Sequence, residues 1–235
     1  MTSKAAAKKA FFITGTDTNV GKTLIAAGLL VAAKNRGLTT AALKPVAAGC
    51  EQTAEGLRNG DALLLQSVIT QSLAYDQINP YPLEAAIAPH IAAQQEKRSL
   101  SVDRLSGFCR GVLASANFTL LEGAGGWRVP INARETLADL AKNLQLPVIV
   151  VVGVRLGCIN HALLTLEAII RDGLPVAGWV ANCVDAEMPV LQENIDSLRA
   201  RLPAPCLGVV PFLAEQLPDV VATYFDETEL LKLFQ

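Results

Sequence analysis

The feature that most constrains this chain is a glycine-bounded loop, GTDTNVGKT at positions 15–23, placed between two regular patterns. The apolar residues before it, 11–14, are typical of a short buried strand, and residues 22–36 have the periodicity of a helix. A strand, a tight turn and a helix in this order direct free backbone N–H groups at one point. The pattern therefore predicts an anion site early in the chain.

Two side chains give this loop a more specific chemistry. Lys22 adds a mobile cation for phosphate oxygens, and the Thr23 hydroxyl is suited to hold magnesium. The spacing is G-x5-G-K-T, one residue longer than the usual phosphate-binding loop, with Thr16 where a glycine normally stands. We interpret the segment as a modified P-loop. The alternative is a plain glycine turn with a surface Lys-Thr pair at the start of a helix.

Beyond the loop, short apolar runs alternate with amphipathic stretches. The runs predict strands at 11–14, 40–44, 118–122, 148–153, 177–182 and 207–210, and the stretches predict helices at 22–36, 61–69, 102–116, 137–144, 160–171 and 189–201. This alternation indicates an α/β fold, a mostly parallel sheet with helices on both faces. A length of 235 residues suits a single domain over 1–235, with residues 1–9 frayed. The least regular segments, 49–59 and 77–89, are expected to be loops near a site.

Charge and composition argue against several classes of function. The 20 Lys and Arg residues nearly balance the 22 Asp and Glu residues, and no basic run is longer than Lys8-Lys9, so we expect no nucleic-acid partner. The longest apolar stretches, 24–33 and 147–154, are about half the length that spans a bilayer, so we expect no membrane partner. The five cysteines are scattered and form no C-x-x-C pair, which favours reduced thiols in a cytoplasmic protein.

Three charged residues lie where a nucleotide site at the same edge of the sheet needs them. Lys44 ends the second expected strand, and Glu122 ends the third, directly before a glycine-rich turn at 123–126. That is the position of a Walker B-type acid. Asp61 opens an expected helix. Each also has a simpler interpretation: a solvated strand-end lysine, a capping or solvated glutamate, and a helix N-cap.

Six motifs follow one another along the chain. They are GTDTNVGKT at 15–23, KPVA at 44–47, EGLRNGDA at 55–62, EGAGGW at 122–127, VVGVRLGCINHA at 151–162 and GWVAN at 178–182. Together they resemble the dethiobiotin synthetase family, ATP-dependent enzymes of biotin synthesis with a P-loop NTPase-like fold. One such motif would be weak support, but six in order, from about residue 11 to about residue 215, are specific.

The resemblance implies a ligase that closes a ring. In the family, 7,8-diaminononanoate, CO2 and ATP give dethiobiotin, ADP and phosphate in the presence of Mg²⁺. One amine takes up CO2 as a carbamate, the carbamate attacks the γ-phosphorus, and the second amine displaces phosphate. This chemistry needs charge neutralisation and alignment more than proton transfer by side chains. His90 and His161 are accordingly expected to be structural.

The resemblance also implies roles by position. Lys44 and Lys22 are the expected catalytic residues, and Thr23, Asp61 and Glu122 the expected magnesium ligands. The expected nucleotide-binding residues are Asn19, Val20, Gly21, Lys22, Thr23, Leu24, Asp61, Glu122, Gly123, Ala124, Gly125, Asn182, Cys183, Pro211, Phe212 and Leu213. The expected substrate-binding residues are Ala48, Gly125, Gly157, Cys158, Ile159 and Asn160. The last four open a helix whose free N–H groups suit a carboxylate, and the family completes this site across a homodimer.

The chain departs from the family pattern at three places. Asn19 stands where a glutamate is common, Ala48 stands where a serine or threonine is common, and residues 185–194 lack a tyrosine that some members have. These departures predict weaker diamine affinity than in relatives with both groups, and a smaller effect on ATP.

Three alternatives to this activity stay open. The first is a divergent paralogue that acts on another amine. The second is a partition-type ATPase switch, but such proteins have an additional lysine early in the loop, where this chain has Thr16-Asp17. The third, a cobyrinate-type amidotransferase, would need a glutaminase domain that 235 residues do not accommodate.

Overall fold

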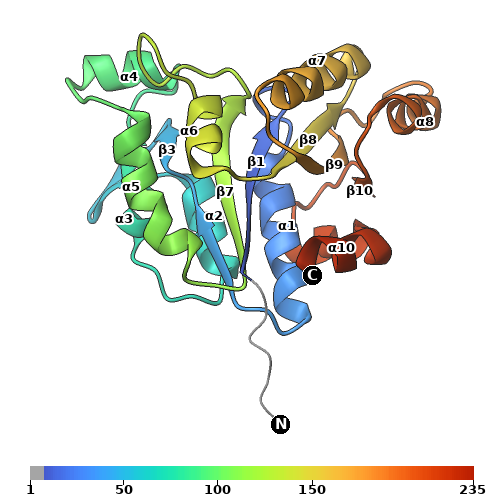
Figure 1. Cartoon of the computed structure of the whole chain (residues 1–235), viewed down its shortest axis with the longest axis horizontal. Helices are drawn as coiled ribbons and strands as arrows, with labels where there is room; N and C mark the ends of the chain where they lie inside the picture. The colour runs from blue at the N-terminus through green and yellow to red at the C-terminus, as the bar shows by residue number, and fades with distance from the viewer. Residues whose placement is uncertain (1–7) are drawn as a thin grey trace.

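The computed structural model describes residues 8–235, and a six-stranded parallel sheet forms its centre (Figure 1). The order across the sheet is β10-β9-β8-β1-β7-β2. The strands are β1 (Lys9–Gly15), β2 (Thr40–Leu43), β7 (Phe118–Gly126), β8 (Val148–Val154), β9 (Val176–Cys183) and β10 (Cys206–Val210). Within 8–235 every pairing in this sheet is parallel, which confirms the expected fold class.

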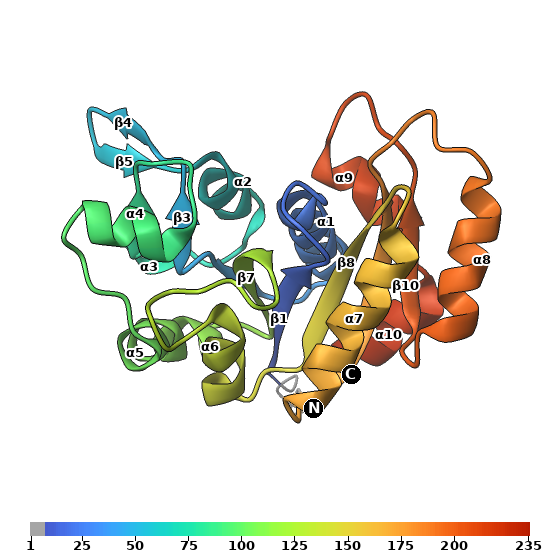
Figure 2. The ribbon, with the colours of Figure 1, turned by 90° about the horizontal axis from the view of Figure 1, so that it is seen from above.

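Helices cover both faces of the sheet (Figure 2). One face packs against α1 (Lys22–Asn35), α2 (Gly60–Val68), α9 (Pro218–Val221) and α10 (Glu227–Phe234), and the other packs against α5 (Val102–Leu113), α6 (Leu137–Leu144), α7 (Cys158–Arg171) and α8 (Leu191–Arg201). Each face has its own apolar core. Ile13 of β1 lies in the core with Leu29 of α1, and Phe12 lies in the other core with Leu166 of α7. Neighbouring β1 residues thus point to opposite faces, as the strand period of two requires.

Two strands of the sheet, the inner strand β8 and the edge strand β2, are buried along their whole length, and their sequences explain why. Every residue of β8, VIVVVGV, is buried, and so is every residue of β2, TAAL. β-branched and small side chains suit these positions because they pack against helices above and below the sheet. Because the strands are buried, polar groups that can reach a ligand lie at the strand ends, where the loops begin.

Shorter elements lie outside the main sheet. β3 (Val46–Ala48) pairs in parallel with β6 (Tyr81–Leu83), and β4 (Glu51–Thr53) pairs antiparallel with β5 (Gly56–Arg58). α3 (Tyr75–Ile78), α4 (Pro89–Gln95) and the 3-10 helix η1 (Ala222–Tyr224) are also present. The segments expected as loops, 49–59 and 77–89, therefore contain short strands. Strands of three residues are too short to show a periodic pattern.

The sequence predicts that residues 1–9 fray. In the structure β1 begins at Lys9, and Lys8 Nζ donates to the Ala114 carbonyl at 2.6 Å. The rest of that segment, 1–7, lies outside the described residues. The glycine-rich segment after Glu122 is not a turn, because β7 continues to Gly126, which pairs with β1. Pairing with β1 keeps this segment in the sheet, although the register shifts between Glu122 and Gly126 and Gly125 has a left-handed φ of 63°.

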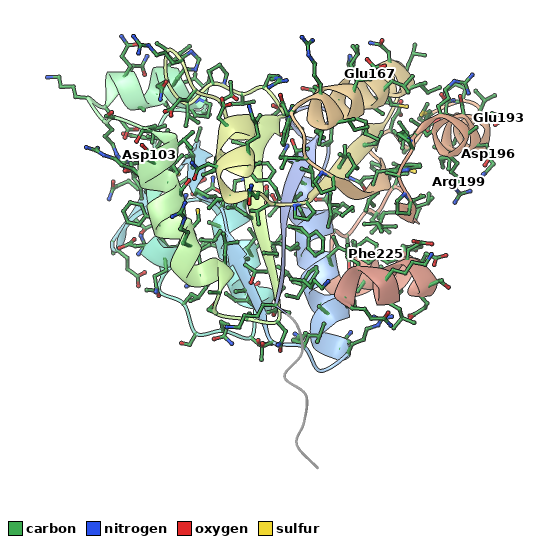
Figure 3. The ribbon with its side chains drawn as sticks, in the orientation of Figure 1. Asp103, Glu167, Glu193, Asp196, Arg199 and Phe225 are labelled. Atoms are coloured by element: carbon green, nitrogen blue, oxygen red, sulfur yellow. The ribbon has the colours of Figure 1, made fainter. Side chains whose placement is uncertain are left out.

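The outer face of α8 carries charged side chains. Figure 3 shows Glu193, Asp196 and Arg199 of α8 pointing away from the sheet, and Asp196 pairs with Arg199 at 3.5 Å. Exposed pairs of this kind contribute only ~0–1 kcal/mol, so the buried face of α8 holds it in place. Among residues 8–235, no helix is long and apolar enough to cross a membrane.

Candidate functional site

A cavity of about 1040 Å³ opens where β1, β2, β7 and β9 end. Open α/β sheets bind ligands at this edge, beyond the carboxyl ends of their parallel strands. The charged side chains that line the cavity are Lys22, Lys44, Asp61 and Glu122. Two cations and two carboxylates therefore face one space.

The loop after β1 is shaped by two residues with left-handed backbones. Asn19 has a φ of 58°, and Gly21, the N-cap of α1, has a φ of 84°. Gly21 is also tightly packed, since a Cβ there would lie 2.2 Å from Asn182 Nδ2. Asn182 Nδ2 donates to the Val20 carbonyl at 2.9 Å. This bond joins the loop to β9, so contacts from across the sheet hold the loop in shape.

Lys22 lies in the first turn of α1 and is almost fully buried. Its Nζ donates to the Asp17 carbonyl at 3.1 Å, and the Asp17 carboxylate pairs with Arg155. Burial lowers the pKa of Lys22 to about 8, although the charge of Glu122 acts in the opposite direction. A bound anion would favour the ammonium form and raise this pKa again.

The centre of the cavity holds a cluster of four side chains. Lys44 Nζ donates to Glu122 Oε1 at 2.6 Å and to Asp61 Oδ2 at 2.7 Å. Thr23 Oγ1 donates to the same Glu122 oxygen at 2.8 Å. Lys44 and Glu122 are buried, whereas the Asp61 side chain is 48% exposed. Asn59, not Asp61, is the N-cap of α2, which leaves the Asp61 carboxylate available to Lys44.

The charges of this cluster support one another. Burial opposes the charge on Lys44, but Glu122 and Asp61 outweigh it, so the pKa of Lys44 is raised. Burial also opposes the charge on Asp61, and Lys44 outweighs it, so the pKa of Asp61 is lowered. Glu122 Oε2 is buried and has no hydrogen-bond partner within 8–235. A buried carboxylate oxygen without a partner is costly, and a cation or hydrogen-bond donor beside it would remove that cost.

Comparison with known proteins identifies the relatives of the chain. An AAA domain family model matches residues 9–218. The ATP-dependent dethiobiotin synthetase BioD of Cellvibrio japonicus is 67% identical over 224 residues, which cover 95% of this chain and 98% of that protein. The protein of the same name from Aeromonas salmonicida is 49% identical over 95% of this chain and 99% of its own length. The chain belongs to the ATP-dependent dethiobiotin synthetase family.

Solved structures of low identity share the fold of this synthetase family member. A ParA family ATPase from Chlorobium tepidum aligns with a TM-score of 0.54 at 13% identity and covers 97% of both chains. A chain of the MinC:MinD complex of Aquifex aeolicus aligns with a TM-score of 0.55 at 16% identity, over 92% of this chain and 86% of that one. These likenesses confirm the P-loop NTPase-like fold and, at such identity, nothing more.

Most residues that the family pattern assigns to the site line the cavity. They are Asn19, Gly21, Lys22, Thr23, Leu24, Lys44, Ala48, Asp61, Glu122, Ala124, Gly125, Asn182, Cys183, Pro211, Phe212 and Leu213. Val20 and Gly123 are not in the lining. Val20 is 1% exposed and reaches Asn182 only through its carbonyl, and Gly123 packs against the Phe12 ring.

The residues assigned to the diamine are divided between two places. Ala48 and Gly125 line the cavity, but Gly157, Cys158, Ile159 and Asn160 do not. The latter four lie at the N-terminus of α7, where Gly157 is the N-cap with a φ of 92°. Leu156, directly before them, is 95% exposed. In one copy of the chain, the α7 N-terminus is therefore separate from the cavity.

Part of the cavity wall is absent from the sequence-based assignment. It consists of Thr18, Leu64, Ala86, Ile87, Ala88, Pro89, Val129, Pro130, Val184 and Gln216. These side chains are uncharged, and apart from Thr18, which belongs to the 15–23 loop, they lie in no motif with a stated chemistry. The irregular composition of 77–89 is the one signal that points to part of this wall. We therefore assign these residues to the shape of the cavity.

Gly21→Ala is expected to weaken ATP binding by about tenfold or more, because a left-handed backbone costs a residue with a Cβ roughly 1–2 kcal/mol and the new Cβ would displace Asn182. Titration calorimetry with Mg-ATP measures this change. Gly37→Ala is the matched control: its φ is 78°, but nothing lies within 4 Å of a Cβ there. Equal losses of ATP affinity in the two variants would contradict the role of the Gly21–Asn182 contact.

Proposed function

We propose that this chain closes a cyclic urea from 7,8-diaminononanoate and CO2 at the expense of ATP, giving dethiobiotin, ADP and phosphate. The observation that carries the proposal is the cluster of Lys44, Asp61 and Glu122 beside a phosphate-binding loop. The two BioD proteins compared above, 67% and 49% identical, support this reaction over a partition-type switch. A divergent amine substrate is the alternative that the assay below separates.

The nucleotide is assigned to the half of the cavity between α1 and the loop after β10. Gly21, Lys22 and Thr23 supply backbone N–H groups, an ammonium group and a hydroxyl to phosphates at the N-terminus of α1. Asn182, which lies against Gly21, and the backbone of Pro211–Leu213 also line the cavity and are assigned to the edge of the adenine ring. Asn182 uses one N–H for the Val20 carbonyl, which leaves its second N–H and its carbonyl oxygen for a base.

Mg²⁺ fits the oxygen atoms of this site. Thr23, Asp61 and Glu122 offer a hydroxyl and two carboxylates, the hard ligands that Mg²⁺ prefers in combination with phosphate oxygens. The unpaired Glu122 Oε2 is the observation that supports a cation here. The charged side chains that line the cavity balance one another, so a triphosphate needs a further positive charge. When bound, the metal would neutralise the charge that develops on the transferred phosphoryl group.

The reaction runs in three steps that require little proton transfer by side chains. An amine nitrogen of the diamine attacks CO2, forming a C–N bond and releasing a proton, to give a carbamate. A carbamate oxygen attacks the γ-phosphorus while the bond to ADP breaks. The second amine then attacks the carbamoyl carbon, loses a proton, and phosphate leaves with the C–O bond electrons. Alignment and charge stabilisation supply the rate enhancement.

Lys44 is the residue best placed to stabilise the anionic groups. Its raised pKa keeps it protonated at neutral pH, and its Nζ lies between Asp61 and Glu122 rather than in solvent. We assign it to the negative charge shared by the carbamate and the γ-phosphate. Lys22, held against the loop carbonyl of Asp17, is assigned to the phosphates.

We place the substrate carboxylate at the α7 N-terminus of a second copy of the chain. Free N–H groups at a helix start bind anions. At the start of α7 the Cys158 N–H donates to the Arg155 carbonyl at 2.9 Å, so the proposal uses the other N–H groups of this turn. Gly157–Asn160 do not line the cavity of their own chain. The exposed Leu156 beside them supports an interface at this place. A homodimer would bring each α7 start to the partner's cavity.

The free cysteines Cys50, Cys109, Cys158, Cys183 and Cys206 support a cytoplasmic location.

Purified protein mixed with 7,8-diaminononanoate, bicarbonate and Mg-ATP is expected to form dethiobiotin, detected by mass spectrometry as the diamine plus one CO2 less one water. A mixture without ATP is the control. ATP hydrolysis with no such product would overturn the assignment. Product formation from another diamine alone would favour the divergent paralogue.

Lys44→Ala is expected to lower kcat by about 10²–10³, the usual effect of losing one group that stabilises transition-state charge, while ATP still binds. Lys22→Ala should weaken ATP binding as well, because its ammonium group lies at the phosphate loop. Steady-state kinetics and calorimetric ATP titration separate the two effects. A normal kcat in Lys44→Ala would return Lys44 to the role of a structural ion-pair partner.

Glu122→Gln is expected to raise the Mg²⁺ concentration at half-maximal rate, because the amide removes the charge and offers a single carbonyl oxygen. Asp61→Asn should act in the same direction. The measurement is the initial rate against Mg²⁺ concentration at fixed ATP. Glu193→Gln on the outer face of α8 serves as a control for loss of one carboxylate. An unchanged Mg²⁺ requirement in both site variants refutes the metal assignment.

A further inference from the structure

A chain of hydrogen bonds joins the backbones of Lys44 and Asp61. Asn79 Nδ2 donates to the Lys44 carbonyl at 2.7 Å, and the Tyr75 hydroxyl donates to Asn79 Oδ1 at 3.0 Å. The same hydroxyl accepts from the Asn59 backbone N–H at 2.8 Å. Asn59 Oδ1 accepts from the Asp61 backbone N–H at 3.1 Å. The two residues whose side chains meet in the cavity are thus connected a second time.

The connecting residues are buried and lie outside the cavity lining. Asn79 is 0% exposed, Tyr75 is 7% exposed and Asn59 is 8% exposed. Buried polar groups are costly unless each has a hydrogen-bond partner. Here each donor of the hydrogen-bond chain has an acceptor in the next residue of that chain. Their hydrogen bonds are explained without a ligand. These bonds hold the backbone at Lys44 and at Asp61.

Local structure fixes the network from the other side. Tyr75 begins the single turn α3, and Asn79 follows its end, so the Asn79 N–H donates to the Tyr75 carbonyl at 2.8 Å. The Lys44 N–H donates to the Ile78 carbonyl at 2.9 Å, which ties Lys44 to the same turn. The Arg58 guanidinium lies over the Tyr75 ring, 4.2 Å from its centroid. Both ends of the Tyr75 side chain are therefore held.

We propose that Asn59, Tyr75 and Asn79 are positioning residues that fix the Lys44 ammonium group relative to the Asp61 carboxylate. The proposal rests on the proposed function only for the roles of Lys44 and Asp61. Lys44 leaves the sheet directly after β2, and Asp61 lies on α2, so no shared strand pairing sets their separation. The hydrogen-bond chain through α3 fixes the distance between the two backbones. A lysine side chain has several rotatable bonds, and a fixed backbone origin limits where its nitrogen can reach.

Tyr75→Phe tests the proposal, with Tyr81→Phe as its matched control. Both changes remove one hydroxyl, and each ring lies under a guanidinium, that of Arg58 for Tyr75 and that of Arg98 for Tyr81. The Tyr81 hydroxyl takes no part in the network. We expect kcat for dethiobiotin to fall by between about tenfold and a hundredfold in Tyr75→Phe, since small misplacements of reacting groups cost that much. The KM for ATP should change less, because the phosphate loop reaches this network through the side chains of Thr23, Glu122 and Lys44 and not through its own backbone.

A second measurement is independent of catalysis. Acylation of the Lys44 amine by an N-hydroxysuccinimide ester, followed by peptide mass spectrometry, reports how often Lys44 leaves its carboxylate partners. Loss of one hydrogen bond should speed this reaction by about two- to tenfold in Tyr75→Phe and leave it unchanged in Tyr81→Phe. If the wild-type chain forms no dethiobiotin, the proposed function fails, while the acylation rates still test the positioning.

Unchanged kcat and unchanged Lys44 acylation in Tyr75→Phe would overturn the proposal, even if the melting temperature falls. Equal changes in both tyrosine variants would overturn it as well. If Tyr75→Phe does not fold, Asn59→Ala and Asn59→Asp replace it. Aspartate keeps an acceptor for the Asp61 N–H, so it should restore most of the kcat that alanine removes. Equal kcat values in these two variants would contradict the proposal.

Discussion

The burial of Lys44 against Glu122 is the constraint on which the rest of the site depends. Both side chains are removed from water, and neither charge would be tolerated there without the other. Such a pair adds little to stability, because the cost of removing two ions from water offsets much of their attraction. Its cost is better explained by function: a cation is held ready in a place where water cannot screen it. The sheet must therefore place the two opposite charges next to each other.

The order of the strands places the two charges together. β7 lies between β1 and β2, and in parallel strands all carboxyl ends meet at the same edge. Leu43 pairs with Leu121, so the next residues along the two strands, Lys44 and Glu122, lie side by side at the point where β2 ends. β1 borders β7 on its other side, and α1, which follows it, brings Thr23 to the same Glu122 oxygen. Three neighbouring strands account for three members of the cluster. Asp61 arrives from a helix, which is why its position depends on the cap at Asn59.

The same reasoning explains which features the sequence predicts. The six sheet strands and the helices between them follow from long apolar patterns, and Lys44 and Glu122 follow from their places at the ends of two such patterns. The order of the strands in the sheet cannot be predicted in this way, because neither of two paired segments has a sequence pattern that identifies its partner. The wall at Ala86–Pro89 and the network through Tyr75 are formed by short elements whose residues look like ordinary loop residues. The inclusion of Gly123–Gly126 in β7 depends on pairing with the neighbouring strand β1, which the glycines alone do not reveal.

The two oxygens of Glu122 show how one carboxylate can serve both a lysine and a metal. Oε1 accepts from Lys44 and Thr23, while Oε2 is buried and unpaired within the described residues. A cation on Oε2 would leave the Lys44 bond to Oε1 intact, so metal binding need not release the lysine. Asp61 also bonds Lys44 through a single oxygen, and its half-exposed side chain leaves room for a further ligand. With both cations retained, the site would change from electrically balanced to positive only when the metal enters. An anionic nucleotide is then attracted together with the metal, and a free carboxylate or phosphate is attracted much less without it.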